Sequence, residues 1–122
     1  MPYSVNWEGD NICLKFFGVL KLRDLQEANG LIYADKRFDR MKYQIADFTE
    51  ADTVGMKHTE VVLVSHLDKT ATTWNPSVKV ACVSPDEKTD RLIKEYISIM
   101  GSTSLKCKLF HNIQEAEKWC QE

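Results

Sequence analysis

The chain has 122 residues, of which 43% are hydrophobic and 28% charged, and a formal net charge of -2 at pH 7. This composition is typical of one globular domain with a single core, and the charge gives no reason to expect a nucleic-acid partner. No apolar run approaches the roughly 20 residues that a membrane span needs, and residues 1–4 lack the features of a signal peptide. We therefore expect one cytoplasmic domain over residues 1–122.

The N-terminal half predicts a hairpin, a helix and a third strand. Apolar and polar residues alternate over residues 3–8 and again over residues 12–20, with the turn formers Gly9, Asp10 and Asn11 between them. A helix is expected over residues 24–34, where Asp24 and Glu27 have the spacing of a capping box. The third strand is predicted over residues 42–48, followed by a polar loop over residues 50–56.

The C-terminal half alternates between helices and strands. Residues 78–84 are short, β-branched and bounded by turn formers, which predicts a buried central strand. A helix is expected after it over residues 86–100, with Gly101 placed for a left-handed cap. Residues 106–110 form the last predicted strand, and Asn112 caps a closing helix. The helix before the central strand is marked by an apolar stripe: Val61, Val64, Leu67, Ala71 and Trp74.

The resulting order, β-β-α-β-α-β-α-β-α, predicts an α/β fold with a mostly parallel sheet and an antiparallel N-terminal strand. Alternation along the strands assigns most apolar residues to a first face: Tyr3, Val5, Trp7, Ile12, Leu14, Phe16, Tyr43, Ile45, Val78, Val80, Cys82, Cys107 and Leu109. The second face carries apolar residues toward the strand ends: Phe17, Val19, Ala46, Phe48, Ala81, Val83 and Phe110. We expect the helices to pack mainly on the first face and to leave the second partly open.

Three short segments carry a resemblance to a known family. They are residues 43–49 (YQIADFT), residues 75–81 (NPSVKVA) and Phe110 followed by residues 116–119 (AEKW). With this order of elements, the chain resembles the SpoIIAA-like (STAS-type) family, many of whose members are uncharacterised bacterial proteins. The resemblance implies a (β-α) superhelix and a cytoplasmic regulatory or ligand-sensing module.

Some members of that family are regulated by phosphorylation. The anti-sigma-factor antagonists carry D-S-S-G after the corresponding strand, and their second serine is phosphorylated. The matching stretch here is Asp52-Thr53-Val54-Gly55. Thr53 matches the first serine, but Val54 has no hydroxyl, so we expect the serine phospho-switch to be absent.

Polar residues follow several predicted strands, where open parallel sheets bind their ligands. Together with Thr53, the candidate ligand or partner residues are Asp47, Thr49, Ser84 and His111. Asp86 and Asn112 lie at the same strand ends. A structural role competes with the functional one, because short polar side chains also bond loop backbone and cap helices.

Metal, cofactor and catalytic signatures are missing from the sequence. Cys13, Cys82, Cys107 and Cys120 show no C-x-x-C pairing, and we expect free thiols. His58 and His66 lie too far apart on a helix to share a metal ion. No motif for acyl transfer, zinc hydrolysis or nucleotide binding occurs, so we expect no catalytic residues, no cofactor and no enzyme.

The expected function is therefore a non-enzymatic regulatory or protein-interaction module. Two alternatives remain: a carrier for a small apolar or anionic ligand, and an enzyme that uses the strand-end polar cluster. A protein partner, a homodimer or a small-molecule ligand is compatible with the sequence. For the homodimer we predict an association surface on the second face: Phe17, Val19, Phe48, Val83 and Phe110.

Overall fold

The computed structural model describes residues 2–122, which fold around one five-stranded sheet. The elements follow the predicted order, with one short 3-10 helix (η1) added after the first α-helix. Their bounds are β1 (Tyr3–Glu8), β2 (Asn11–Val19), α1 (Leu22–Ala34), η1 (Lys36–Arg40), β3 (Tyr43–Asp52), α2 (His58–Ala71), β4 (Lys79–Val83), α3 (Glu87–Met100), β5 (Lys106–Phe110) and α4 (Ile113–Gln121).

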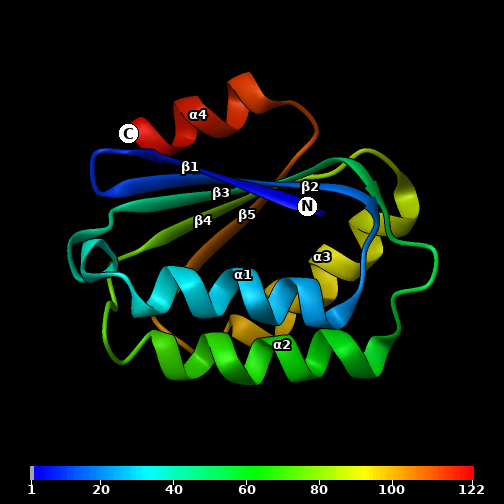
Figure 1. The fold of residues 1–122 in the computed structure, drawn as a ribbon, viewed down its shortest axis with the longest axis horizontal. Helices are drawn as coiled ribbons and strands as arrows, with labels where there is room; N and C mark the ends of the chain where they lie inside the picture. The colour runs from blue at the N-terminus through cyan, green and yellow to red at the C-terminus, as the bar shows by residue number, and fades with distance from the viewer. Residues whose placement is uncertain (1) are drawn as a thin grey trace.

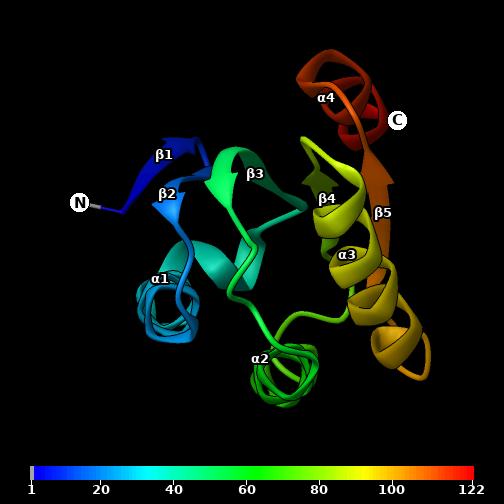
Figure 2. The same cartoon turned by 90° about the vertical axis from the view of Figure 1, so that its right-hand side faces the viewer.

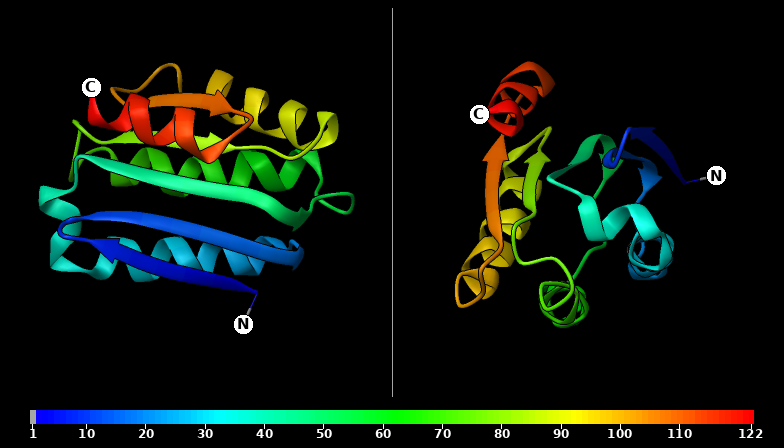
Figure 3. Two further views of the ribbon diagram at one scale, coloured as in Figure 1. Left: turned by 90° about the horizontal axis from the view of Figure 1, so that it is seen from above. Right: turned by 90° about the vertical axis from the view of Figure 1, so that its left-hand side faces the viewer.

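The strands lie in sequential order, β1-β2-β3-β4-β5, as the left view of Figure 3 shows. Only β1 and β2 pair antiparallel, and every later neighbour pairs parallel. Gly9 in the β1–β2 turn has a φ of +65°, a backbone conformation that glycine adopts without the steric penalty of a side chain. The predicted fold class is confirmed in its element order and in the direction of every strand.

Helices cover both faces of the sheet. In Figures 1 and 2, α1, α2 and α3 lie on one side and α4 lies on the other. The three-helix side buries the first face, where Leu14 and Phe16 pack with Ala28 and Ile32 of α1. On the other side, Ala116 and Cys120 of α4 pack over the second face. The expectation of a partly open second face is therefore wrong where α4 covers it.

The predicted phase of β3 was wrong. The sheet register aligns Leu14 with Ala46 and Cys13 with Ile45, so Ala46 shares the first face with Leu14. Tyr43 and Ile45 face α4 instead, in one cluster with Ala116. Because both faces of β3 are covered, apolar residues occur in both phases, and alternation alone does not indicate which face is which.

Several predicted element boundaries also differ. The capping box assigned to Asp24 is wrong, because α1 begins at Leu22 and Lys21 is its N-cap residue. Strand β3 continues to Asp52, through part of the segment expected to be loop. Gly101 has a φ of -60°, so it is not a left-handed cap.

The apolar stripe of the second helix contains two errors. Leu67 and Trp74 are 37% and 58% exposed, and α2 ends at Ala71. The buried residue at the next position is Asp68. The core side of α2 therefore includes the charged Asp68, and its apolar neighbour Leu67 faces outward.

The five residues proposed as an association surface do not form one exposed patch. Phe48 stacks on Phe16 on the first face, with ring centroids 5.2 Å apart and an interplanar angle of 6°. Val83 and Phe110 are buried beneath α4. Phe17 and Val19 alone among the five remain exposed, because α4 packs over β3, β4 and β5 and not over β2.

Candidate functional site

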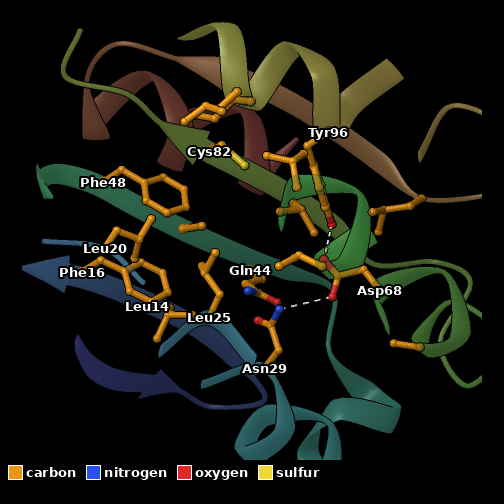
Figure 4. Close-up of a pocket in the computed structure, with 18 of the residues that line it drawn as sticks. Leu14, Phe16, Leu20, Leu25, Asn29, Gln44, Phe48, Asp68, Cys82 and Tyr96 are labelled. Carbon is orange, nitrogen blue, oxygen red and sulfur yellow. Dashed lines mark hydrogen bonds between the residues drawn. The ribbon is translucent and has the colours of Figure 1, made fainter. Parts of the chain in front are cut away.

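A cavity of about 110 Å³ lies between the first face of the sheet and helices α1, α2 and α3. Its walls are mostly apolar. Figure 4 shows five side chains of strands β2 and β3, the β2–α1 loop and α1 grouped at one end. They are Leu14, Phe16, Leu20, Leu25 and Phe48. An engineered cavity of about 150 Å³ with comparable walls binds benzene, so this space is of the size of one small ring.

A polar cluster borders the other end of the cavity. The carboxylate of Asp68 on α2 accepts hydrogen bonds from Asn29 at 3.2 Å, Tyr33 at 2.5 Å and Tyr96 at 2.5 Å. Asn29 and Tyr33 belong to α1, and Tyr96 belongs to α3. One buried carboxylate therefore joins the three helices that roof the cavity.

The ionisation of this cluster follows from its burial. Removal from water raises the pKa of Asp68 to about 6, and the hydrogen bonds from Tyr33 and Tyr96 oppose that rise. Burial, reinforced by the nearby Asp68 charge, raises the pKa of both tyrosines well above the ordinary value. At neutral pH the cluster is thus a carboxylate held by neutral hydroxyl donors.

Two further polar groups line the cavity. Gln44 of β3 is 7% exposed and lies between the apolar end and Asp68 in Figure 4. Thr53 is buried, and its Oγ1 lies 2.8 Å from Oγ1 of Thr89 at the start of α3. Among the five candidate ligand or partner residues predicted from the sequence, Thr53 alone lines the cavity, and Phe48 of the predicted association surface lines it as well.

Asp47 and Thr49 lie at an irregularity in β3. Lys15 of β2 pairs with Asp47 of β3, and Phe17 of β2 pairs with Glu50 of β3. The two β2 residues are two positions apart and the two β3 residues are three apart, so β3 carries one extra residue, a β-bulge. The carboxylate of Asp47 accepts hydrogen bonds from the Thr49 amide at 2.9 Å and its hydroxyl at 2.7 Å. These bonds satisfy the bulged backbone, which supports the structural role for Asp47 that competed with a ligand role.

Ser84 and His111 approach one another at the ends of β4 and β5. Nε2 of His111 lies 3.0 Å from Asp90 of α3, and Oγ of Ser84 donates to the Asp86 carbonyl at 3.0 Å. Hydrogen bonds lower the pKa of Asp90 below its ordinary value, and the bond with Ser84 has a larger effect than the bond with His111. Activation of a serine requires a hydrogen bond from the hydroxyl to the base, whereas the Ser84 hydroxyl contacts the Asp86 carbonyl and the Asp90 carboxylate and makes no hydrogen bond to His111. These contacts of Ser84 and His111 hold the first turn of α3 against the ends of β4 and β5.

The most distinctive cavity residues were missed by sequence reasoning. Gln44, Asn29 and Asp68 are polar residues at buried positions of otherwise apolar faces. A polar residue at an otherwise apolar position was the sequence signal that could have identified them. Asp68, for example, follows Val61 by seven residues and Val64 by four, which places all three on one side of α2.

Residues 2–122 offer neither a metal site nor a membrane-spanning helix. No group of three or more His, Cys, Asp or Glu side chains in this range is placed to hold a metal ion. Within the same residues, every helix is too short or too polar to cross a membrane. The apolar cavity with its polar end is therefore the candidate that the geometry offers.

Comparison with known proteins identifies the fold. The chain is similar to the crystal structure of an uncharacterised DUF3478-family protein with a SpoIIAA-like fold from Shewanella loihica PV-4. The two share 15% sequence identity with a TM-score of 0.58, over 97% of this chain and 91% of that one. No protein-family model and no curated protein matches the sequence. The SpoIIAA-like fold expected from the sequence is confirmed.

Proposed function

We propose that this SpoIIAA-like chain is a non-enzymatic module that binds a small, largely apolar ligand between its sheet and helices α1–α3. The observation that carries the proposal is the cavity of about 110 Å³, with aromatic and aliphatic walls and one polar end. Binding pockets for small molecules typically combine apolar walls with a few polar groups that fix orientation. The cytoplasmic location expected from the sequence is part of this proposal.

The roof of the cavity suits a regulatory role. Helices α1 and α2 line the cavity through Leu25 and Val64, and they expose Leu31 and Leu63 on their outer sides. A ligand that fills the cavity contacts both helices and the sheet at once. Ligand binding would thereby change the positions of α1 and α2, whose outer sides are exposed to a partner protein.

A titration with benzene tests the proposal, because benzene fits the walls and carries no polar group. Amide chemical shifts in a ¹H–¹⁵N correlation spectrum should change with saturation, at residues that line the cavity. Ala46→Leu adds three carbons at a buried position inside the cavity and should weaken benzene binding at least tenfold.

Ala34→Leu is the matched control, since Ala34 is exposed near the end of α1 and lies outside the cavity wall. This variant should bind benzene as the wild type does. Absence of saturable shifts in the wild type, or unchanged binding by folded Ala46→Leu, would contradict the proposal.

Protein interaction is the second candidate function. Leu31 on α1 is 58% exposed, and Leu63 and Leu67 on α2 are 51% and 37% exposed. A contiguous exposed apolar patch is typical of a partner surface, and we propose that these leucines on the neighbouring helices α1 and α2 contribute to one. Sedimentation of the wild type against Leu63→Glu tests self-association: a wild-type dimer that dissociates in the variant would support it, and a wild-type monomer at high concentration would exclude a homodimer.

A further inference from the structure

The amide of Gln44 stands out among the buried amides of this protein. Asn75 donates to the carbonyls of Phe38 and Met41 at 2.7 Å each, and Asn29 donates to Asp68. Gln44 is equally buried, yet its side chain makes no hydrogen bond with any residue among 2–122, and Figure 4 draws none. Polar groups at buried positions nearly always have a partner, either protein or ordered water, so an amide that lines a cavity without a protein partner is free to pair with a ligand there.

The charge of the surroundings restricts what that ligand is. The described residues that line the cavity include no Lys, Arg or His, and their one ionisable carboxylate is Asp68. An anionic ligand would meet this carboxylate without any compensating cation. A cationic ligand would find the Asp68 oxygens already accepting three hydrogen bonds. The surroundings therefore favour a neutral ligand.

We propose that Gln44 is a specificity-determining residue that selects a neutral, ring-sized ligand carrying a hydroxyl or carbonyl group. This inference rests on the proposed function, because it assigns a ligand class to the same cavity. The ring occupies the space beside Phe16 and Phe48, and its polar group pairs with the Gln44 amide, which both donates and accepts hydrogen bonds.

Phenol and benzene test the inference as a pair, since they differ by one hydroxyl. Their dissociation constants are measured by calorimetry for the wild type and for Gln44→Met, which keeps the length of the side chain and removes its amide. The ratio of the benzene constant to the phenol constant should fall about tenfold in Gln44→Met, the size of one net hydrogen bond. Leu14→Met alters an apolar wall residue and should leave the ratio unchanged.

The outcomes separate this inference from the proposed function. If the wild type binds benzene but the ratio is the same in Gln44→Met, the role of Gln44 is overturned and the binding function stands. If the wild type binds neither compound, the binding function fails and the inference fails with it. An equal change of the ratio in Leu14→Met would also overturn the role of Gln44.

Benzoate at pH 7 tests the selection against charge. It is close in size to phenol and carries a carboxylate, which should weaken binding at least tenfold relative to phenol. Equal affinity for benzoate and phenol would overturn the preference for neutral ligands.

Discussion

The hydroxyl of Tyr96 on α3 donates a 2.5 Å hydrogen bond to Oδ2 of Asp68 on α2. Tyr33 of α1 bonds the other oxygen of the same carboxylate at 2.5 Å. Distances of this size are typical of a hydroxyl that donates to an ionised acceptor. The three helices above the cavity are thus joined through one acidic side chain.

Tyr96→Phe removes one donor from this carboxylate. We expect the free energy of unfolding in urea at pH 7 to fall by about 1.5 to 3 kcal/mol, the range for hydrogen bonds to charged groups. Tyr43→Phe is the control, because the Tyr43 hydroxyl accepts only a 3.3 Å bond from Gln121. Equal losses of unfolding free energy in the two variants would show that the Tyr96–Asp68 hydrogen bond contributes no more to stability than the Tyr43–Gln121 bond.

The stability should depend on pH through Asp68. Its pKa is raised to about 6 in the folded state from an ordinary value of 3.8. A raised pKa means that the folded state binds the proton more tightly, so this contribution is complete below pH 3.8 and is lost as pH rises through 6. Asp68→Asn should remove that loss, which urea unfolding at pH 4, 5, 6 and 7 would measure.

Asp35 serves as the control, because its contribution to stability changes with pH in the opposite direction and over a lower pH range. Hydrogen bonds from the Arg37 side chain and backbone lower the pKa of Asp35 to about 2. Its contribution is present above pH 3.8 and is lost as pH falls toward 2. Asp35→Asn should therefore leave the pH dependence between 4 and 7 unchanged. A flat wild-type profile over that range would contradict the assignment to Asp68.

Gln44→Met should stabilise the protein in the absence of ligand. The variant replaces an amide that has no protein partner by an apolar side chain of similar length, so an apolar group takes the place of a polar one on a mostly apolar wall. Thermal unfolding of the purified, ligand-free protein should show a higher midpoint for the variant. A lower midpoint would indicate that the amide already has a partner.

Phosphorylation at the Asp52–Gly55 loop should be absent. Val54 is 76% exposed but has no hydroxyl, and the hydroxyl of Thr53 is buried against Thr89. Thr53→Asp should lower stability by about 3 kcal/mol or more, since it buries an unpaired charge. Val54→Asp should change stability by no more than about 0.5 kcal/mol. Stoichiometric phosphate on Thr53 in protein from its native cells would contradict this prediction.

Phe48→Glu should damage folding rather than association. Phe48 is half-buried and stacks on Phe16 inside the three-helix side, so a carboxylate there loses the aromatic contact and part of its water without gaining a partner. We expect a loss of about 3 kcal/mol or more in urea unfolding. Phe17→Glu is the matched control, because Phe17 is 37% exposed and lies beside Lys15. A folded, fully stable Phe48→Glu would show that this side chain is not part of the core.

Local patterns were enough to predict most elements and their order. Residues 106–110 were predicted as the last strand with the observed bounds, because Lys106 and Lys108 alternate with apolar neighbours between clear turn signals. The sequential strand order agrees with the general tendency of successive strands to lie side by side. Both kinds of information are contained in neighbouring residues.

The cavity depended on information that single elements do not carry. Ala46 and Ile45 are both apolar, and only the position of α4 determines which of them faces the cavity. Gln44 and Asp68 have the same residue types as many solvent-facing residues. Their burial follows from the packing of α1, α2 and α3 together, which a pattern along one segment does not reveal.

The sequential order of the strands also bears on how the chain folds. Each strand pairs with the one before it in the sequence, so pairing requires closure of only one connection, which is the β1–β2 turn or a single helical segment. We expect the β1–β2 hairpin to provide a template onto which β3, β4 and β5 add in turn as the chain leaves the ribosome. The roof over the cavity is complete only once α3 has been synthesised, so a ligand of the proposed kind would have access to the cavity until α3 docks.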